Sequence, residues 1–248
     1  MTTPPDADRV SYEPNVAAAA TDKPSLVEDF IEIFYAPSRV FARRQRGGFG
    51  IPLLIITLLT ALFMFASRSV FSQIFDAEFS RRTAKAMAEN PRVTQEMVDR
   101  MRPMQEMIAQ VFAYLITPIL ILVVALVVWL VAKAIKAKLS YTQSATITTF
   151  AWIPRVVSSL LGAAQVLLMD TTNVTSPYAL SFSPARFMSP DTTNPKLYGI
   201  AASFDVFAIW YTILLGIGIA VIGRVPRSKG YLAAAIVFIV GIIPSLFA

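Results

Sequence analysis

The chain has 248 residues, of which 55% are hydrophobic and only 15% are charged. This composition is too apolar for an ordinary soluble globule and predicts a protein surrounded by lipid. The formal net charge is +6, but the basic residues form short clusters beside apolar runs, so we expect membrane lipid rather than nucleic acid as a partner. Cysteine and histidine are absent, which excludes disulfides, thiolate nucleophiles, Cys/His zinc sites and imidazole bases. We expect no cofactor and no metal.

The N-terminal region predicts a tail followed by helices at the membrane surface. Prolines, an alanine run and scattered charge over residues 1–24 are typical of a disordered cytosolic tail. Ser25 and Glu28 match a capping box that starts a short amphipathic helix, and after Pro37 apolar residues alternate with arginines. We expect residues 25–46 to form amphipathic interfacial helices. The side chains expected to contact lipid are Phe30, Phe34, Arg39, Phe41, Arg43, Arg44 and Arg46. The alternative is a cytosolic helix that packs on the membrane domain.

Five apolar stretches come near the ~20 residues that a helix needs to cross a bilayer. They predict an all-α polytopic membrane protein with about five transmembrane helices in a domain over residues 47–248. The expected spans are residues 49–67, 108–132, 145–169, 198–222 and 231–247.

The segment between the first two spans, residues 68–107, predicts a helical hairpin on the outer side, with a break at Asn90-Pro91. Met97, Met101 and Met104 recur there at helical spacing. Thioethers suit Cu(I), but methionines at this spacing are more often packing residues or, less often, a promiscuous contact surface. We expect no copper site.

Three clusters of Lys and Arg predict the orientation, because basic residues mark the cytoplasmic side. They are Arg39 to Arg46 before the first span, Lys133 to Lys138 after the second, and Arg224 to Lys229 after the fourth. With five spans these clusters fall on one side, so we expect the N-terminus in the cytoplasm and the C-terminus outside. The seven basic residues of 68–107 argue against this orientation. The loop over residues 170–197 is expected to fold over the bundle or to bind something.

Two formally charged residues fall inside the expected spans, Arg155 and Asp205. An ionisable group at membrane depth is by default a candidate functional site. Each lies on a helix face of small and hydroxylated residues, which allow close helix contacts. The residues expected to pack between helices are Ser158, Ser159, Gly162, Ala208, Thr212 and Gly216.

Two interpretations of this intramembrane charged pair remain open. In the first, Arg155 and Asp205 neutralise each other between the third and fourth spans, or reach the headgroups, and lock the bundle. In the second, they bind a transported ion or a lipid headgroup. A catalytic interpretation needs two convergent groups, and the Gly-x-Gly-Asp pattern of aspartyl intramembrane proteases is absent. We therefore expect that the protein is not an enzyme.

The order of short patterns carries a family resemblance. An amphipathic stretch from Asp29 to Phe34 leads to the sequence from Pro37 to Phe41, the third span contains Ala151 to Arg155, and the fourth contains Asp205 to Trp210. From about Ser25 onward the chain resembles the bacterial branch of the Yip-one family, whose eukaryotic members are named for interaction with Ypt/Rab GTPases. The resemblance implies a five-helix membrane domain with a cytosolic N-terminus. The Asp-Leu-Tyr-Gly-Pro-type motif of the eukaryotic branch is not found here, so GTPase binding is not carried over.

The function predicted from these observations is that of a non-enzymatic membrane scaffold or accessory protein of a bacterial inner membrane. It would act through contacts with lipids and with another membrane protein or a second copy of itself. The alternative is a small transporter or channel component in which Arg155 and Asp205 line an oligomeric pathway. A hydrated route between the third and fourth spans favours transport, whereas a dry, tightly packed seam favours scaffolding.

Overall fold

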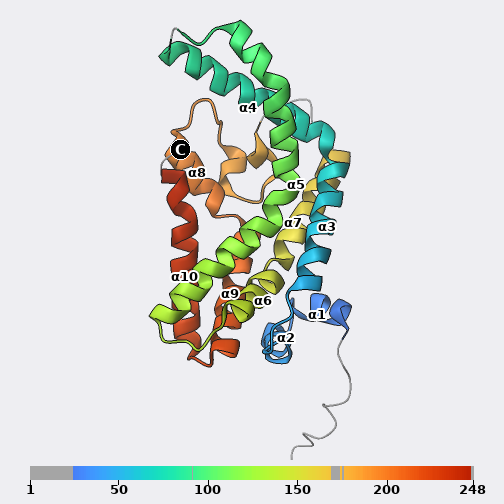
Figure 1. Cartoon of the computed structure of the whole chain (residues 1–248), viewed down its shortest axis with the longest axis vertical. Coiled ribbons are helices and arrows are strands. Elements are labelled where there is room, and N and C mark those ends of the chain that lie inside the picture. The colour runs from blue at the N-terminus through green and yellow to red at the C-terminus, as the bar shows by residue number, and fades with distance from the viewer. Residues whose placement is uncertain (1–24, 91, 169–173, 175, 247–248) are drawn as a thin grey trace, which may run out of the picture.

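The computed structural model describes residues 25–90, 92–168, 174 and 176–246. Every regular element in these residues is a helix, which confirms the all-α fold (Figure 1). The tail predicted over residues 1–24 lies outside the described residues. The elements are α1 Leu26–Glu32, α2 Pro37–Arg43, α3 Gly50–Ala66, α4 Arg68–Glu89, α5 Gln95–Ala134, α6 Tyr141–Ala151, α7 Ile153–Leu168, η2 Pro177–Leu180, η3 Pro184–Phe187, α8 Pro195–Ser203, α9 Val206–Gly223, α10 Arg227–Ile242 and η4 Ile243–Leu246.

Four segments in the described part of the chain are long and apolar enough to cross a membrane. They are Gln95–Ala134 (α5), Tyr141–Leu168 (α6 with α7), Val206–Gly223 (α9) and Arg227–Leu246 (α10 with η4). A fifth candidate is α3, which continues into α4 after a bend of 76°. The expectation of about five spans therefore agrees with the four to five candidates that the structure contains.

The fourth expected span, residues 198–222, is interrupted, and this corrects the prediction. Helix α8 ends at Ser203, and α9 begins at Val206. Asp205 is the N-cap of α9, because its side chain accepts hydrogen bonds from the first backbone N–H groups of that helix. A short carboxylate is well suited to satisfy the free N–H groups at a helix start. Asp205 therefore lies at the end of a span and not inside one.

Helix α9 is the central helix of the bundle and packs against α10, α6, α2 and α7. Glycines allow the closest of these contacts. A Cβ atom added to Gly230 of α10 would lie 2.4 Å from the carbonyl oxygen of Gly216 and 2.8 Å from the Cβ of Ala220. Only a glycine fits here, so α9 and α10 meet backbone against backbone.

Residues 144–151 of helix α6 are buried although four of them, Ser144, Thr146, Thr148 and Thr149, carry hydroxyl groups. The side chains of Ser144, Thr146 and Thr148 each donate a hydrogen bond to the carbonyl four residues earlier. These bonds satisfy three of the four buried hydroxyls within the helix, whereas Thr149 Oγ1 has no partner among the described residues. A hydroxylated helix can therefore occupy the interior of this membrane domain.

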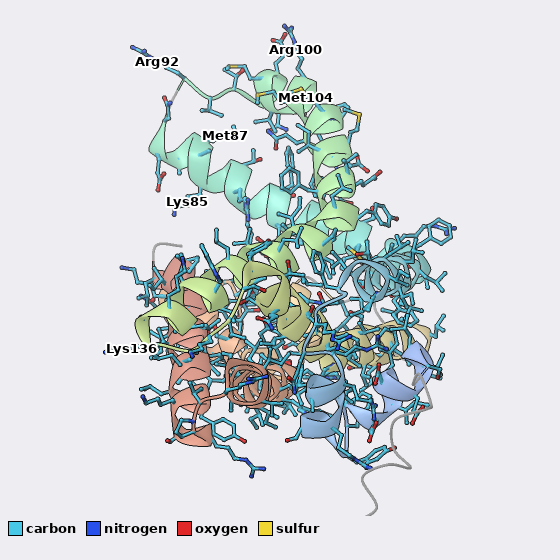
Figure 2. All side chains as sticks on the ribbon, turned by 60° about the horizontal axis from the view of Figure 1, so that its bottom comes forward. Lys85, Met87, Arg92, Arg100, Met104 and Lys136 are labelled. Atoms are coloured by element: carbon cyan, nitrogen blue, oxygen red, sulfur yellow. The ribbon has the colours of Figure 1, made fainter. Side chains whose placement is uncertain are left out.

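The two ends of the bundle differ (Figure 1). The α2 end carries α1, α2, the C-terminal end of α5 and the connection between α9 and α10. The α8 end carries α8, the short helices η2 and η3, and a projecting arm that consists of α4 and the first part of α5, residues 68–107. Figure 2 shows Arg92, Arg100 and Met104 on this arm, away from the bundle. Two helices thus form where a hairpin was expected, and its location on the outer side of the membrane stays a prediction.

Candidate functional site

Arg155 lies three residues after the interruption between α6 and α7. Helix α6 ends at Ala151 with Trp152 as its C-cap, and Pro154 is the second residue of α7. Proline has no N–H to donate to the preceding turn of a helix, which explains the interruption of the third span at this point. Because α7 packs against α9, the side chain of Arg155 is directed toward residues of α9.

The guanidinium of Arg155 contacts two aromatic rings. Its Cζ atom is 5.0 Å from the ring centroid of Trp152 and 5.1 Å from that of Tyr211. Cation–π contacts of this kind stabilise a guanidinium but supply no hydrogen-bond acceptor in its plane. The Nε atom of Arg155 is buried and has no hydrogen-bond partner among the described residues. The cation is therefore held in place with part of its hydrogen-bonding capacity unused.

Asp205 does not neutralise Arg155 by direct contact. None of the ion pairs formed by the described residues contains either of the two. Instead, Asp205 Oδ1 accepts from the N–H groups of Phe207 at 2.9 Å and Ala208 at 3.3 Å, and Oδ2 accepts from Phe182 N–H at 2.8 Å. The described residues therefore do not form the expected ion pair, and the carboxylate instead serves the backbone around the start of α9.

Both residues line one cavity of about 580 Å³, which we call the Arg155 cavity. It lies among α3, α5, α7, α9 and α10, with residues of α8 and η2 at one end. Four buried side-chain polar atoms in the described part of the chain lack a hydrogen-bond partner, and three of their residues line this cavity, Thr60, Arg155 and Tyr211. Buried polar groups usually have partners. Their concentration in one cavity makes it the candidate site.

Tyr178 of η2 and residues of α8 line the α8 end of the cavity. The hydroxyl groups of Ser176 and Tyr198 are 2.5 Å apart, and the rings of Tyr178 and Tyr198 meet edge to face. Burial, together with Tyr198 and Glu78, raises the pKa of Tyr178. Its hydroxyl therefore stays protonated at neutral pH, and this end of the cavity presents an uncharged donor.

The residues expected to pack between helices have different surroundings. Gly216 is in close contact, since a Cβ atom there would lie 2.5 Å from Cδ1 of Tyr231. Ala208 is buried and, like Ser158, Ser159 and Thr212, lines the Arg155 cavity. Gly162 has no described atom within 4 Å of the position its Cβ would take. The close contact expected at Gly162 is therefore wrong.

A cluster of ion pairs joins α1 to α2 at the α2 end. Asp29 and Glu32 of α1 are buried, at 0% and 3% exposure. Arg43 donates hydrogen bonds to both carboxylates, Arg44 donates to Asp29, and Arg39 pairs with Glu32 at 2.9 Å. Burial disfavours the charge on Arg43, but the hydrogen bonds and charges of Asp29 and Glu32 outweigh it and raise the pKa of Arg43. We call these five residues the acid–arginine clasp.

The clasp corrects the lipid contacts expected for residues 25–46. Arg43 and Arg44 bind buried acidic side chains instead of being free for anionic lipid. Arg39 pairs with Glu32, but its side chain is 69% exposed, and its lipid contact stays a prediction. Phe41 is fully buried in the protein core. Phe30 and Phe34 are partly exposed and pack edge to face on Phe150 and Trp210. Arg46 is exposed, and its lipid contact stays a prediction.

Comparison with known proteins agrees with this architecture. The family model of the Yip1 domain matches residues 31–248. The chain belongs to the Yip1 domain family. A similar protein is membrane protein YknW of Bacillus subtilis (strain 168), which is 25% identical over 235 residues, 93% of this chain and 92% of YknW. No solved structure matches significantly. The resemblance inferred from the sequence is thus confirmed, and the Yip1 match contains the whole Arg155 cavity.

Two residues of the site in this Yip1 domain were missed by the sequence analysis. Tyr211 and Thr60 line the cavity, and each has a hydroxyl with no hydrogen-bond partner among the described residues. A signal was present for Tyr211, because a tyrosine hydroxyl in the middle of an apolar span needs a polar neighbour. Thr60 carried no comparable signal, since a threonine in a helix usually bonds its own backbone.

Proposed function

We propose that this Yip1-family protein is a non-enzymatic membrane scaffold that holds another membrane protein through its projecting arm. The supporting observation is the methionine stripe of α5, Met97, Met101 and Met104, which is 52%, 44% and 52% exposed. With Ile108 these residues recur at intervals of four, three and four, so they share one face of the helix. Packing within the chain, the commoner role of such methionines, does not account for side chains this exposed.

The charges of the arm argue against burial of the stripe in lipid. Asp99, Arg100 and Arg102 lie between the methionines, and charged groups in the hydrocarbon of a bilayer are costly. Arg102 is also tied to Asp76 of α4 at 2.6 Å and lies over the ring of Phe79. The arm is therefore a braced pair of helices in water or among headgroups, with its methionines uncovered.

An uncovered methionine face suits a helical partner. Methionine side chains are flexible and polarisable, and they adapt to partners of different shape. Intervals of four and three are also those of a helix that packs along another helix. The partner would be another membrane protein or a second copy of this chain, as the sequence led us to expect.

Single cysteines in this naturally cysteine-free chain test the proposal. Met101→Cys places the thiol on the stripe, and Asp99→Cys places it on the opposite side of the same helix turn. Intact membranes would be treated with a short bifunctional thiol–amine crosslinker. A discrete adduct at position 101 and none at position 99 is the expected result, and mass spectrometry of the adduct identifies a partner or a second copy. Equal crosslinking at both positions, or none at either, contradicts the proposal.

The cellular setting is part of the same proposal: a bacterial inner membrane, with the α2 end in the cytoplasm. In support, all three basic clusters, Arg39 to Arg46, Lys133 to Lys138 and Arg224 to Lys229, belong to elements at the α2 end. Basic residues favour the cytoplasmic side. Single cysteines at Ser38 and Thr192 can be labelled in intact cells with an impermeant reagent, and labelling at 192 alone is expected. The reverse pattern contradicts the orientation.

The transport alternative has no support from the comparisons. A cavity does lie between the third and fourth spans, but Asp205 caps a helix within it, and its oxygens are taken by backbone donors. We therefore treat the cavity as a place where a ligand is held.

A further inference from the structure

We propose that the Arg155 cavity binds a phosphate group, carried by a membrane lipid or present as free phosphate. The buried polar groups of the cavity lining that lack hydrogen-bond partners in the described part of the chain can all donate hydrogen bonds. The Nε atom of Arg155 can only donate a hydrogen bond, and the hydroxyls of Tyr211 and Thr60 can also donate. All three are buried and lack partners among the described residues. Tyr211 as a whole is only 6% exposed. The residues of all three line the cavity, and a ligand with several acceptor oxygens suits such a set of donors.

The charges of the cavity lining also favour a phosphate group. Arg155 and Asp205 are the two formally charged residues of the cavity lining. The carboxylate of Asp205 is satisfied by two backbone N–H groups at the start of α9 and by that of Phe182, and the start of the helix carries partial positive charge. The charge of Arg155 has no such compensation from hydrogen-bonded acceptors. The cavity therefore favours an anion over a cation, and phosphate matches a planar guanidinium.

The volume of the cavity and the apolar side chains of its wall suit a ligand of lipid size. A volume of about 580 Å³ lies within the ~300–1,000 Å³ of ordinary ligand sites and exceeds the ~30 Å³ that one water occupies. Apolar side chains of α5 and α10, among them Leu120, Val124 and Val237, form part of the wall. Such a wall suits the glycerol and acyl part of a lipid. The shared feature of both ligand sources is the phosphate itself.

The depth of the site fits a lipid headgroup near the α8 end. Tyr211 lies twelve residues from Gly223, the end of α9 on the α2 side, or ~18 Å at 1.5 Å per residue. Asp205 and the residues of α8 lie further toward the α8 end. The cavity is thus in the half of the membrane domain next to the α8 end, within reach of that leaflet's headgroups.

The full chain, purified in detergent and depleted of lipid, provides the test. Native mass spectrometry would count bound phosphatidylglycerol, and a phosphate-free glucosyl diacylglycerol with the same acyl chains serves as the matched lipid. Inorganic phosphate is added separately, alone and in competition. We expect one phosphatidylglycerol per chain and no retained glucolipid. Binding of inorganic phosphate without binding of either lipid would identify free phosphate as the ligand.

Variants locate the binding in the cavity. Arg155→Gln should weaken phosphate or lipid binding about tenfold or more, because a charge-assisted contact is lost. Tyr211→Phe removes only the unpartnered hydroxyl, keeps the ring beside Arg155, and should weaken binding several-fold. Arg224→Gln and Tyr231→Phe are matched controls at exposed positions, and they should bind as the unmodified chain does.

Two results overturn the proposal. One is the absence of binding by both probes to the unmodified chain. The other is unchanged binding in Tyr211→Phe together with unchanged binding in Arg155→Gln. If Arg155→Gln does not fold, Tyr211→Phe decides the outcome alone, since a phenylalanine preserves the packing of the site. Crosslinking at the arm is independent of these results, so failure here leaves the scaffold proposal standing.

Discussion

Gly218 of α9 lies directly against the ring of Phe41 of α2. A Cβ atom on Gly218 would be 3.1 Å from Cε1 and Cζ of Phe41, and 2.6 Å from Cγ2 of Ile147 on α6. Helices α2, α6 and α9, which are distant in sequence, therefore contact one another at this glycine. Helix α2 is consequently part of the membrane domain's core and not an attachment to its surface.

Replacement of Gly218 by alanine tests this contact. The added methyl group must displace either the buried Phe41 ring or Ile147, and such overpacking costs about 1–3 kcal/mol. We expect a lower thermal midpoint for the purified chain. Gly162→Ala is the matched control, because it also lies within a helix but faces open space, where alanine gains up to about 1 kcal/mol over glycine. Equal midpoints for the two variants contradict the packing described here.

The contact of α9 with α10 makes a second glycine essential. A Cβ on Gly230 would lie 2.4 Å from a backbone oxygen, that of Gly216, and a backbone cannot rotate away as a side chain can. Gly230→Ala should therefore destabilise the fold more than Gly218→Ala, by about 3 kcal/mol if α10 shifts to relieve the clash. Gly241→Ala on the same helix, with no described atom within 4 Å, should leave the thermal midpoint nearly unchanged. If Gly230→Ala lowers the thermal midpoint only slightly, α9 and α10 must be further apart than the contact of Gly230 with the Gly216 carbonyl oxygen requires.

The acid–arginine clasp predicts a difference between two neighbouring acidic residues. Asp29 is buried and bound by Arg43 and Arg44, whereas Glu28 is exposed at the start of α1. Asp29→Asn leaves two guanidiniums without their shared carboxylate and should cost about 3 kcal/mol. Glu28→Gln should cost little.

Limited proteolysis of membrane vesicles measures this difference, because a loosened α1 exposes the connection to α2. We expect rapid cleavage near residues 33–36 in Asp29→Asn and slow cleavage in Glu28→Gln and the unmodified chain. Similar cleavage rates in all three proteins indicate that the clasp contributes nothing to the attachment of α1.

Features of the fold that depend on local sequence could be predicted, whereas features that depend on the packing of distant helices could not. The spans were predictable, because a helix that crosses a bilayer needs about twenty apolar residues whatever its neighbours are. The break at Asp205 was also visible in principle, since an aspartate directly before an apolar run is a helix-start signal. Hydropathy over a window averages across such a cap and joins α8 to α9.

The clasp and the cavity could not be predicted in the same way. The pattern of α1 placed Asp29 and Glu32 on a polar face, but that face turns inward because α2 folds back and brings three arginines to it. The Arg155 cavity is formed by five helices, so its lining depends on their packing and not on any local pattern. Arg155 itself was identified because a charge within an apolar run is rare.

The last prediction separates the capping role of Asp205 from a role as the counterion of Arg155. As an N-cap, Asp205 is replaceable by asparagine, whose side-chain oxygen can accept the same bonds from Phe207 and Ala208. As a counterion, it is not replaceable, because asparagine carries no charge. Asp205→Ala should lower the stability of the purified chain by about 1–2 kcal/mol. Asp205→Asn should lower it by less, because asparagine keeps the bonds from Phe207 and Ala208 and loses only the bond from Phe182 N–H. Combination of each with Arg155→Gln completes two double-mutant cycles. No hydrogen bond joins the two side chains, and only the longer-range charge interaction of Asp205 with Arg155 couples them, so the effects should nearly add. Two results together would show that the two charges are coupled. Asp205→Asn and Asp205→Ala would lose equal stability, and each double variant with Arg155→Gln would lose less than the sum of its two single variants.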